Sequence, residues 1–495
     1  MEKLASLSPQ PLWNLFEELS RIPRPSKHEE RAVQWLLEKG RTLGCEVLLR
    51  PLVGETQIGN VLFRKPATPG SEARPGVALQ AHIDMVCEKS SASPHRFDTD
   101  PIQLQIRGDH LYATDTTLGS DNGIGVAAAL AVLASRDIAH GPLEVLITVD
   151  EETGLTGASQ LEPGLLQSQY LLNLDSEEEG ILTIGCAGGV DTLCTGALAS
   201  QPVAADWLPL TIAVRGLKGG HSGMEINCGR GNAIRLLAQT LAALSPEITF
   251  SLANMEGGNL RNAIAREATA LLWAPPSQIP VIHTAVQQAE TYWRSAFAGR
   301  EPELSIKASP ALSTADASTP LRAAFDDKGT VTLLNLVLAL PHGVAAMSPE
   351  VPGLVETSTN LARLQAAEGA ASLHFLTRGS ITPFRDELRQ RIEATCALAG
   401  YQTRHENTYP GWKPSPDNAL VRKFSEIYQH TFGEPLKIAA VHAGLECGLI
   451  GEKYPEMQMV SFGPNIWNPH SPQEHVSIAS VAHFWKLLVA ALESL

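Results

Sequence analysis

The stretch from Gly141 to Glu179 constrains the fold most, because two predicted strands within it both end in acidic residues. These strands are the apolar runs 143–149 and 170–174. The acids directly after them are Asp150, Glu151, Glu152 and Asp175. In open α/β sheets the ligand crevice lies at the carboxyl ends of the strands, so these acids are candidates for chemistry. Adjacent carboxylates repel one another, and a site that holds several of them needs a cation.

Two other segments place polar side chains in similar positions. The predicted strand 77–81 ends in His82-Ile83-Asp84, and residues two apart on a strand face the same side. Asp84 can therefore accept a hydrogen bond from the second ring nitrogen of a metal-bound His82. Asp121 lies in a glycine-rich turn at the start of a predicted helix that ends near residue 134. Taken singly, these residues are more often explained by a satisfied buried histidine and a helix-capping aspartate.

The loop 463–475 contributes His470 and His475, and His470 follows a predicted strand. Two imidazoles with several carboxylates, and no cysteine ligands, favour zinc, manganese or cobalt. The surplus of acids indicates a pair of ions that share a carboxylate.

Length, charge and cysteine content limit the remaining possibilities. A chain of 495 residues is too long for one hydrophobic core, so two or more domains are expected. The net charge of −15 argues against nucleic acid or an anionic membrane as the main partner. The seven cysteines form no CxxC pair, which is typical of reduced thiols in a cytoplasm. The N-terminus has no apolar core of the signal-peptide type, and the uncharged segment 329–349 is predicted to contain a buried helix instead of a membrane span.

The chain is predicted to form a discontinuous α/β catalytic domain, residues 1–188 and 410–495, with an inserted α+β domain at 189–409. Within the insert, 207–244 and 372–399 each read as strand, turn and helix, which suggests two diverged repeats. In that interpretation His221 and Arg378 occupy equivalent turns.

Eight motifs, in this order along the chain, resemble those of the cytosolic aminoacyl-histidine dipeptidases. This family belongs to the two-zinc superfamily that also contains aminoacylases, carnosinases and carboxypeptidase G. The motifs are HIDMV at 82–86, LGSDNGIGVA at 118–127, DEETGLTGA at 150–158, LLNLDSEEEG at 171–180, GLKGGHSGMEINCGRGNA at 216–233, NLRNAIARE at 259–267, HAGLECG at 442–448 and PHSPQEHV at 469–476.

The resemblance implies a two-domain di-metal exopeptidase, with a mixed-sheet catalytic domain and the insert as a lid. It implies two zinc ions, or cobalt or manganese, and a cis peptide bond after Asp121. The implied metal ligands are His82 and Asp175 for one ion, Glu152 and His470 for the other, and Asp121 as the bridge. Asp84 would orient His82, Glu151 would be the general base, and His475 is not required as a ligand.

The resemblance also implies how the substrate is held. His221 would face the developing oxyanion. Asn262, Arg378 and the backbone amide of Gly444 would bind the free carboxyl group of an unblocked dipeptide, Xaa-His among them.

Two alternative functions stay open. An N-acyl-amino-acid deacylase would use the same metal chemistry with a different acyl pocket. A non-enzymatic, zinc-stabilised binding protein is disfavoured, because a structural site does not require Glu151 beside Glu152. A homodimer is possible through the lid, or the repeated halves of the lid could replace the contribution of a partner subunit.

Overall fold

The computed structural model describes residues 4–244, 248–311 and 322–495, and the chain divides into two compact units. The first unit comprises Met1–Cys186, Trp412–Ala440 and Leu445–Leu495. The second comprises Ala187–Gly411 and Val441–Gly444. The sequence predicted divisions after residues 188 and 409, close to these limits. It assigned the short segment Val441–Gly444 to the first unit, whereas the contacts of this segment lie in the second.

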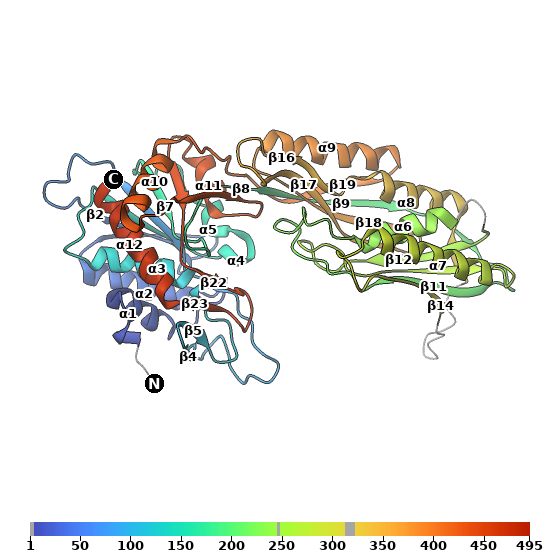
Figure 1. Ribbon diagram of the computed structural model, residues 1–495, viewed down its shortest axis with the longest axis horizontal. Helices are drawn as coiled ribbons and strands as arrows, with labels where there is room; N and C mark the ends of the chain where they lie inside the picture. Colours follow the sequence, from blue (N-terminus) through green and yellow to red (C-terminus); the bar gives the residue numbers. More distant parts are fainter. Residues whose placement is uncertain (1–3, 245–247, 312–321) are drawn as a thin grey trace. The chain divides into compact units, whose positions relative to one another are not determined.

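The main sheet of the first unit has eight strands within the described residues (Figure 1). From edge to edge they are β1 (Glu46–Pro51), β2 (Gly59–Lys65), β6 (Leu143–Thr148), β3 (Val77–His82), β7 (Tyr170–Asn173), β21 (Gln458–Ser461), β8 (Ile181–Cys186) and β20 (Lys437–Val441). Strand β3 pairs in parallel with β6 and β7, and β7 pairs in parallel with β21. Strands β1, β2 and β8 pair antiparallel, so the sheet is mixed, as predicted. Every residue of β3 and β6 is buried, which fits central strands covered on both faces.

Helices cover this sheet, and the central one is α3 (Ser120–Ala134). Its residues are almost all small or apolar and are buried from Ser120 to Leu133, which lets the helix pack closely against β3. Helix α3 also contacts α1 (Gln10–Leu19) and α12 (Ile478–Ser494). The other helices of this unit are α2 (Glu30–Leu43), α4 (Glu151–Gly154), α5 (Thr156–Ser159), α10 (Ala419–Phe432) and α11 (Glu446–Lys453), with the short 3-10 helix η1 (Leu4–Ser6). Helix α1 ends before Pro23 and α2 begins after Pro25, because proline lacks the N–H group that a continuous helix needs.

A smaller sheet of four described strands lies in the same unit and was not predicted from the sequence. Its strands, in order, are β22 (Ile466–Trp467), β23 (His475–Ser477), β5 (His110–Ala113) and β4 (Leu104–Arg107). Each strand has only two to four residues, too few to show a clear alternation of buried and exposed positions.

The second unit is built on a longer antiparallel sheet. In order its strands are β14 (Ser305–Pro310), β11 (Leu208–Arg215), β13 (Ala268–Ala274), β12 (Ser251–Gly257), β17 (Val355–Ala367), β18 (Ala370–Gly379), β9 (Gly188–Ala197) and β19 (Gln402–Tyr409). Strand β16 (Gly343–Met347) also pairs with β17, and β10 (Ser200–Pro202) pairs with β15 (Ala323–Phe325) in a separate ribbon.

This sheet consists of two halves with the same connectivity. Four helices complete them: α6 (Ala233–Leu244), α7 (Ile279–Ala296), α8 (Asp327–Ala339) and α9 (Thr382–Leu398). One half runs β11-α6-β12-β13-α7-β14, and the other runs β9-α8-β17-β18-α9-β19. When the four strands of each half are numbered along the chain, their order across the sheet is 4-1-3-2 in both halves. We therefore retain an internal duplication as a proposal, with the first half inserted between β9 and α8 of the second.

This connectivity changes the predicted correspondence between the halves. The turn after β11, which carries His221, corresponds to the chain leaving β9. The turn after β18, next to Arg378, corresponds to the turn after β13. The expected equivalence of the His221 and Arg378 turns is therefore wrong.

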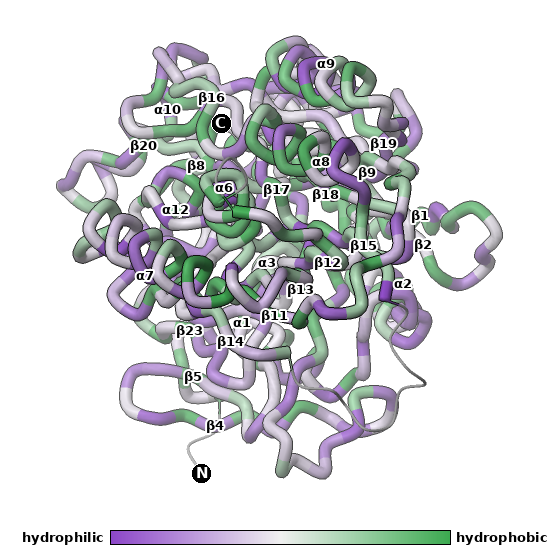
Figure 2. The backbone as a smooth tube through the Cα atoms, turned by 90° about the vertical axis from the view of Figure 1, so that its right-hand side faces the viewer, coloured by the Kyte–Doolittle hydropathy of each residue, from purple (hydrophilic) through white to green (hydrophobic). Residues whose placement is uncertain are grey.

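The helices of the second unit differ in hydropathy. Figure 2 shows α6 as mainly hydrophobic, whereas α7 and α9 mix hydrophilic with hydrophobic residues.

The predicted buried helix in the segment 329–349 is α8, which ends at Ala339 and is followed by β16. None of the helices in the described ranges is long and apolar enough to cross a membrane.

Candidate metal centre

The predicted metal-binding side chains meet at the carboxyl ends of the parallel strands of the first unit. His82 is the last residue of β3, Glu152 lies in the turn of helix after β6, and Asp175 follows β7. Parallel strands end at one edge of a sheet, so these three side chains are brought together by topology alone. Asp121 joins them from the first turn of α3, and His470 from the loop after β22.

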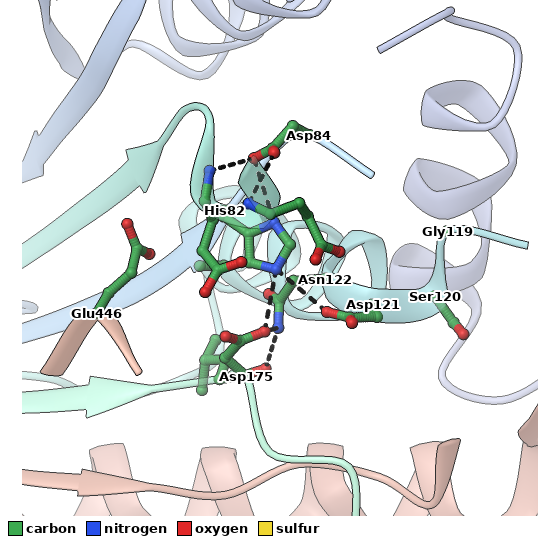
Figure 3. Close-up of polar contacts among 12 residues, drawn as sticks. His82, Asp84, Gly119, Ser120, Asp121, Asn122, Asp175 and Glu446 are labelled. Carbon is green, nitrogen blue, oxygen red and sulfur yellow. Dashed lines mark hydrogen bonds and ion pairs between the residues drawn. The ribbon is translucent and has the colours of Figure 1, made fainter. Parts of the chain in front are cut away.

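The two imidazoles each lie between two carboxylates. The Nε2 atom of His82 is 3.1 Å from Asp121 Oδ1 and 3.2 Å from Asp175 Oδ1 (Figure 3). The Nε2 atom of His470 is 3.2 Å from Asp121 Oδ2 and 3.1 Å from Glu152 Oε2. Asp121 therefore presents one oxygen to each imidazole, which is the arrangement of a carboxylate shared by two three-residue groups. The Asp121–Asn122 peptide bond is cis, as the resemblance implies.

Asp84 organises the residues around His82. Its Oδ1 is 3.4 Å from Nδ1 of His82, the ring nitrogen that faces away from the other carboxylates (Figure 3). Asp84 also accepts hydrogen bonds from the backbone N–H groups of Glu151 (3.0 Å) and Glu152 (3.2 Å) and from the hydroxyl of Ser26 (2.7 Å). One buried carboxylate thus orients an imidazole and the turn that carries both glutamates.

The electrostatics of the cluster favour added positive charge. Burial opposes ionisation of His82, yet the Asp175, Asp121 and Asp84 carboxylates raise its pKa well above the usual value. Hydrogen bonds to Asp121 and Glu152 raise the pKa of His470 to about 11. Burial raises the pKa values of Glu152 and Asp175.

The donor set fits divalent cations. The groups His82–Asp121–Asp175 and Asp121–Glu152–His470 each bring their ligand atoms within 4.8 Å of one another. The Oε1 atom of Glu152 is buried and accepts no hydrogen bond within the described part of the chain, so it is available to a cation. Nitrogen and oxygen donors of this kind suit zinc, cobalt and manganese. A third group combines His82, Glu151 and Glu152, so Glu151 lies beside the same position.

His475, the alternative histidine, belongs to the small sheet instead. Its ring stacks on Tyr112 and on Trp467, with centroid distances of 4.6 and 5.2 Å. Its Nδ1 lies 2.8 Å from the backbone oxygen of Gln473. It is absent from the metal-binding groups found among the described residues.

The predicted substrate-binding residues lie in the second unit. Arg378 is 4% exposed and donates from Nη1 to the hydroxyl of Tyr409 (3.1 Å). Gly444 lies against the ring of the same tyrosine, where a Cβ atom would come within 3.0 Å of the ring. Burial and the nearby Arg378 charge lower the pKa of His221 to about 4. Asn262 is exposed and accepts a hydrogen bond from Ser222 N through its backbone oxygen (2.8 Å).

Glu446 is a buried acid near the metal centre that the sequence analysis missed. Glu446, at the start of α11, accepts hydrogen bonds from Gln80 Nε2 (2.5 Å) and Thr148 Oγ1 (2.7 Å), and Figure 3 shows it near Asp175. Burial raises the pKa of its carboxyl to about 7. Its presence in the HAGLECG motif was the available signal, but that motif was interpreted only through Gly444.

Comparison with known proteins places the chain in a family. Residues 78–494 match peptidase family M20/M25/M40. A cytosol non-specific dipeptidase of Escherichia coli strain K12 is 41% identical over 495 residues, which cover 100% of this chain and 99% of the relative. The crystal structure of an aminoacylhistidine dipeptidase from Vibrio alginolyticus is 40% identical, with a TM-score of 0.89 over 100% of this chain and 98% of that one.

A more distant structure supports the fold alone. The aminopeptidase PepT of Bacillus cereus ATCC 10987 has a TM-score of 0.56 at 18% identity, over 99% of both chains. The resemblance and the fold class predicted from the sequence are confirmed by these similarities. The chain belongs to peptidase family M20/M25/M40.

Proposed function

We propose that this enzyme hydrolyses unblocked dipeptides, including Xaa-His, with the help of two divalent cations, zinc being the favoured metal. The observation that carries the proposal is Asp121, whose two oxygens face His82 and His470 from two separate ligand groups. The full-length similarity to proteins named as dipeptidases supports the substrate class.

In this proposal His82 and Asp175 would hold one ion, Glu152 and His470 would hold the other, and Asp121 would be the ligand that the two ions share. When bound, such ions polarise the scissile carbonyl and make a nearby water more acidic. Asp84 favours the tautomer of His82 that leaves Nε2 free to face the metal, because its carboxylate lies 3.4 Å from Nδ1 and attracts the ring proton to that side.

Glu151 is proposed as the general base. Its backbone N–H is fixed on Asp84, and its carboxylate lies beside His82 and Glu152. From there it can take a proton from water and pass it to the nitrogen of the leaving amine.

His221 is proposed to donate a hydrogen bond to the oxyanion. Its Nδ1 accepts hydrogen bonds from the backbone N–H groups of Gly223 (3.3 Å) and Met224 (3.1 Å). Because its pKa is lowered to about 4, the ring is neutral at pH 7 and carries its proton on Nε2. The Nε2–H is then the donor that an oxyanion requires.

Arg378 is proposed to bind the free carboxyl group of the substrate, together with Asn262 and the amide of Gly444. No carboxylate of the described residues pairs with this buried guanidinium, and its Nε has no hydrogen-bond partner among them. A buried cation without a counter-ion is stabilised by an anionic ligand, and guanidinium suits carboxylates because it can form two parallel bonds.

The experiment that tests this function compares substrate classes on metal-loaded protein. Free dipeptides, with and without C-terminal histidine, are assayed against N-acetyl amino acids. Rapid hydrolysis of the dipeptides, lost on chelation and restored by zinc, cobalt or manganese, is expected. Faster hydrolysis of the N-acetyl amino acids would favour the deacylase alternative, and undiminished turnover after chelation would refute the metal requirement.

The name of the Escherichia coli relative and the seven free cysteines support a cytoplasmic location, which we also propose.

A further inference from the structure

The turn that carries Asp121 is held by two buried charged side chains that have no part in the proposed chemistry. Glu474 is 2% exposed and Arg24 is 1% exposed. They approach this turn from opposite ends of the sequence.

Glu474 caps the start of α3. Its carboxylate accepts hydrogen bonds from the backbone N–H groups of Leu118 (2.7 Å), Gly119 (3.0 Å), Ser120 (2.8 Å) and Asp121 (3.4 Å), and from the hydroxyl of Ser120 (2.6 Å). The first N–H groups of a helix have no partner within the helix, and α3 has no capping side chain at its own N-cap residue. A negative charge here is also favoured by the helix dipole. Glu474 therefore satisfies donors that would otherwise be buried without partners.

Glu474 also links two metal-binding segments. It lies four residues after His470, so one loop supplies both an imidazole of the candidate centre and the cap beneath Asp121. The 3.2 Å separation of His470 Nε2 and Asp121 Oδ2 thus depends on a connection that runs through Glu474.

Arg24 braces the same turn from the other side. Its Nη2 donates to the carbonyl of Gly119 (2.7 Å), and its Nη1 donates to the carbonyls of Ile83 (2.9 Å) and Asp84 (3.2 Å). Gly119 has a φ of +68°, and a Cβ atom there would come within 2.4 Å of the guanidinium. The turn is therefore closed around Arg24, which connects it to the residues directly after His82.

We propose that Glu474 and Arg24 are positioning residues that set the distance of the bridging carboxylate from His470 and from His82, respectively. The inference rests on the proposed two-metal centre and deepens it. Glu474 acts on two of the three ligands of one group, Asp121 and His470. It acts on only one ligand, Asp121, of the group that contains His82 and Asp175. Loss of Glu474 should therefore lower the binding affinities of the two ions by unequal factors.

The test measures metal binding directly. Metal-free wild-type protein and Glu474→Gln are titrated with zinc by calorimetry, with Ser120→Ala as a milder variant that removes only the hydroxyl bond. The matched control is Glu144→Gln, because Glu144 is also buried and accepts bonds from Gln167 N, Ser168 N and Ser168 Oγ at 2.8–2.9 Å. Glu144 lies at the opposite end of β6 from the centre.

We expect Glu474→Gln to lower the affinity for the ion of the Asp121–Glu152–His470 group about 10- to 100-fold, the usual range for residues that orient metal ligands. The affinity for the other ion should fall by clearly less. Ser120→Ala should give a smaller change with the same asymmetry, and Glu144→Gln should change neither affinity. Hydrogen exchange of the 118–121 amides in the metal-free protein should accelerate only in Glu474→Gln. Together, Glu474→Gln and His470→Ala should lower affinity by less than the sum of their separate effects, because both changes act on the same ion.

Arg24→Lys should lower the affinity for the ion held by His82 more than the affinity for the ion held by His470. If a variant lowers the affinities for both ions equally, or lowers only the Tm and leaves both affinities unchanged, the inference for that residue is overturned. Failure of the wild-type protein to bind two ions would instead refute the proposed function, so the two failures are distinguishable.

Discussion

Replacing Arg378 with methionine should separate the function of this residue from its effect on stability. Arg378 is 4% exposed, and within the described ranges its guanidinium makes one hydrogen bond, to the hydroxyl of Tyr409. A buried polar group without partners costs about 1–3 kcal/mol of folding free energy. Arg378→Met removes this cost at similar length, so the variant should have an unchanged or higher Tm.

The same change should greatly reduce catalysis. Two charge-assisted hydrogen bonds to a substrate carboxylate contribute roughly 3 kcal/mol together, or about a hundredfold in kcat/KM. The assay compares a dipeptide with its C-terminal amide. The wild-type enzyme should strongly prefer the free carboxylate, and Arg378→Met should lose most of that preference.

Arg385 provides the matched control for this experiment. It is 3% exposed in the same unit, but it donates to the backbone oxygen of Tyr409 (2.6 Å) and to Asp386 Oδ1 (3.0 and 2.8 Å). Arg385→Met leaves these acceptors without a partner and should lower the Tm, with kcat/KM of the folded enzyme preserved. A fall in Tm for Arg378→Met as large as for Arg385→Met, or an unaltered preference for the free carboxylate, would refute the assigned role.

The remaining predictions concern the metal centre and acid stability. Glu151→Gln should bind both metal ions but lose turnover by at least a hundredfold, and near-normal kcat would disprove the general-base role. His470→Ala should lower the metal content measured by elemental analysis, whereas His475→Ala should not, and the reverse result would exchange the ligand assignment. Burial and Arg235 lower the pKa of His342 to about 3, and its Nδ1 accepts a hydrogen bond from Leu361 N (3.2 Å). The unfolded chain therefore binds more protons below pH 6.5, and stability should fall from there towards pH 3 by at most about 1.4 kcal/mol per pH unit for this group. His342→Asn keeps a hydrogen-bond acceptor that does not titrate. It should therefore flatten the pH dependence of the free energy of unfolding, measured by chemical denaturation at several pH values. An identical slope would exclude His342 as its source.

The residues that the sequence predicted well are those whose position depends on local pattern and simple topology. The apolar runs before His82, Glu151 and Asp175 predict strands, and parallel strands bring their ends together without further information. His470 and Asp121 were less certain from pattern alone, because a proline-rich loop and a helix start occur in many proteins. The motif resemblance selected them, and the structure brings both within 3.2 Å of each other.

The errors arise where the chain order and the spatial order differ. The two halves of the second unit were matched by their strand–turn–helix pattern, but one half is inserted inside the other after β9. A local pattern cannot show which strand of a repeat it represents, so the turns next to His221 and Arg378 were paired incorrectly. The four short strands around His475 were missed because each has too few residues to show a period.

The contacts that organise the site were the least accessible to sequence analysis. Glu474 reaches the N–H of Leu118 across 356 residues, and Arg24 reaches the carbonyl of Gly119 across 95. Each looked like an ordinary charged residue in a proline-containing segment. Asp84 also makes contacts that could not be predicted, although one of its roles was. It was expected to orient His82, but it also holds the backbone N–H groups of Glu151 and Glu152. Because one carboxylate serves the metal ligands and the general base together, a change at Asp84 alters several functions at once, and its effect cannot be assigned to His82 alone.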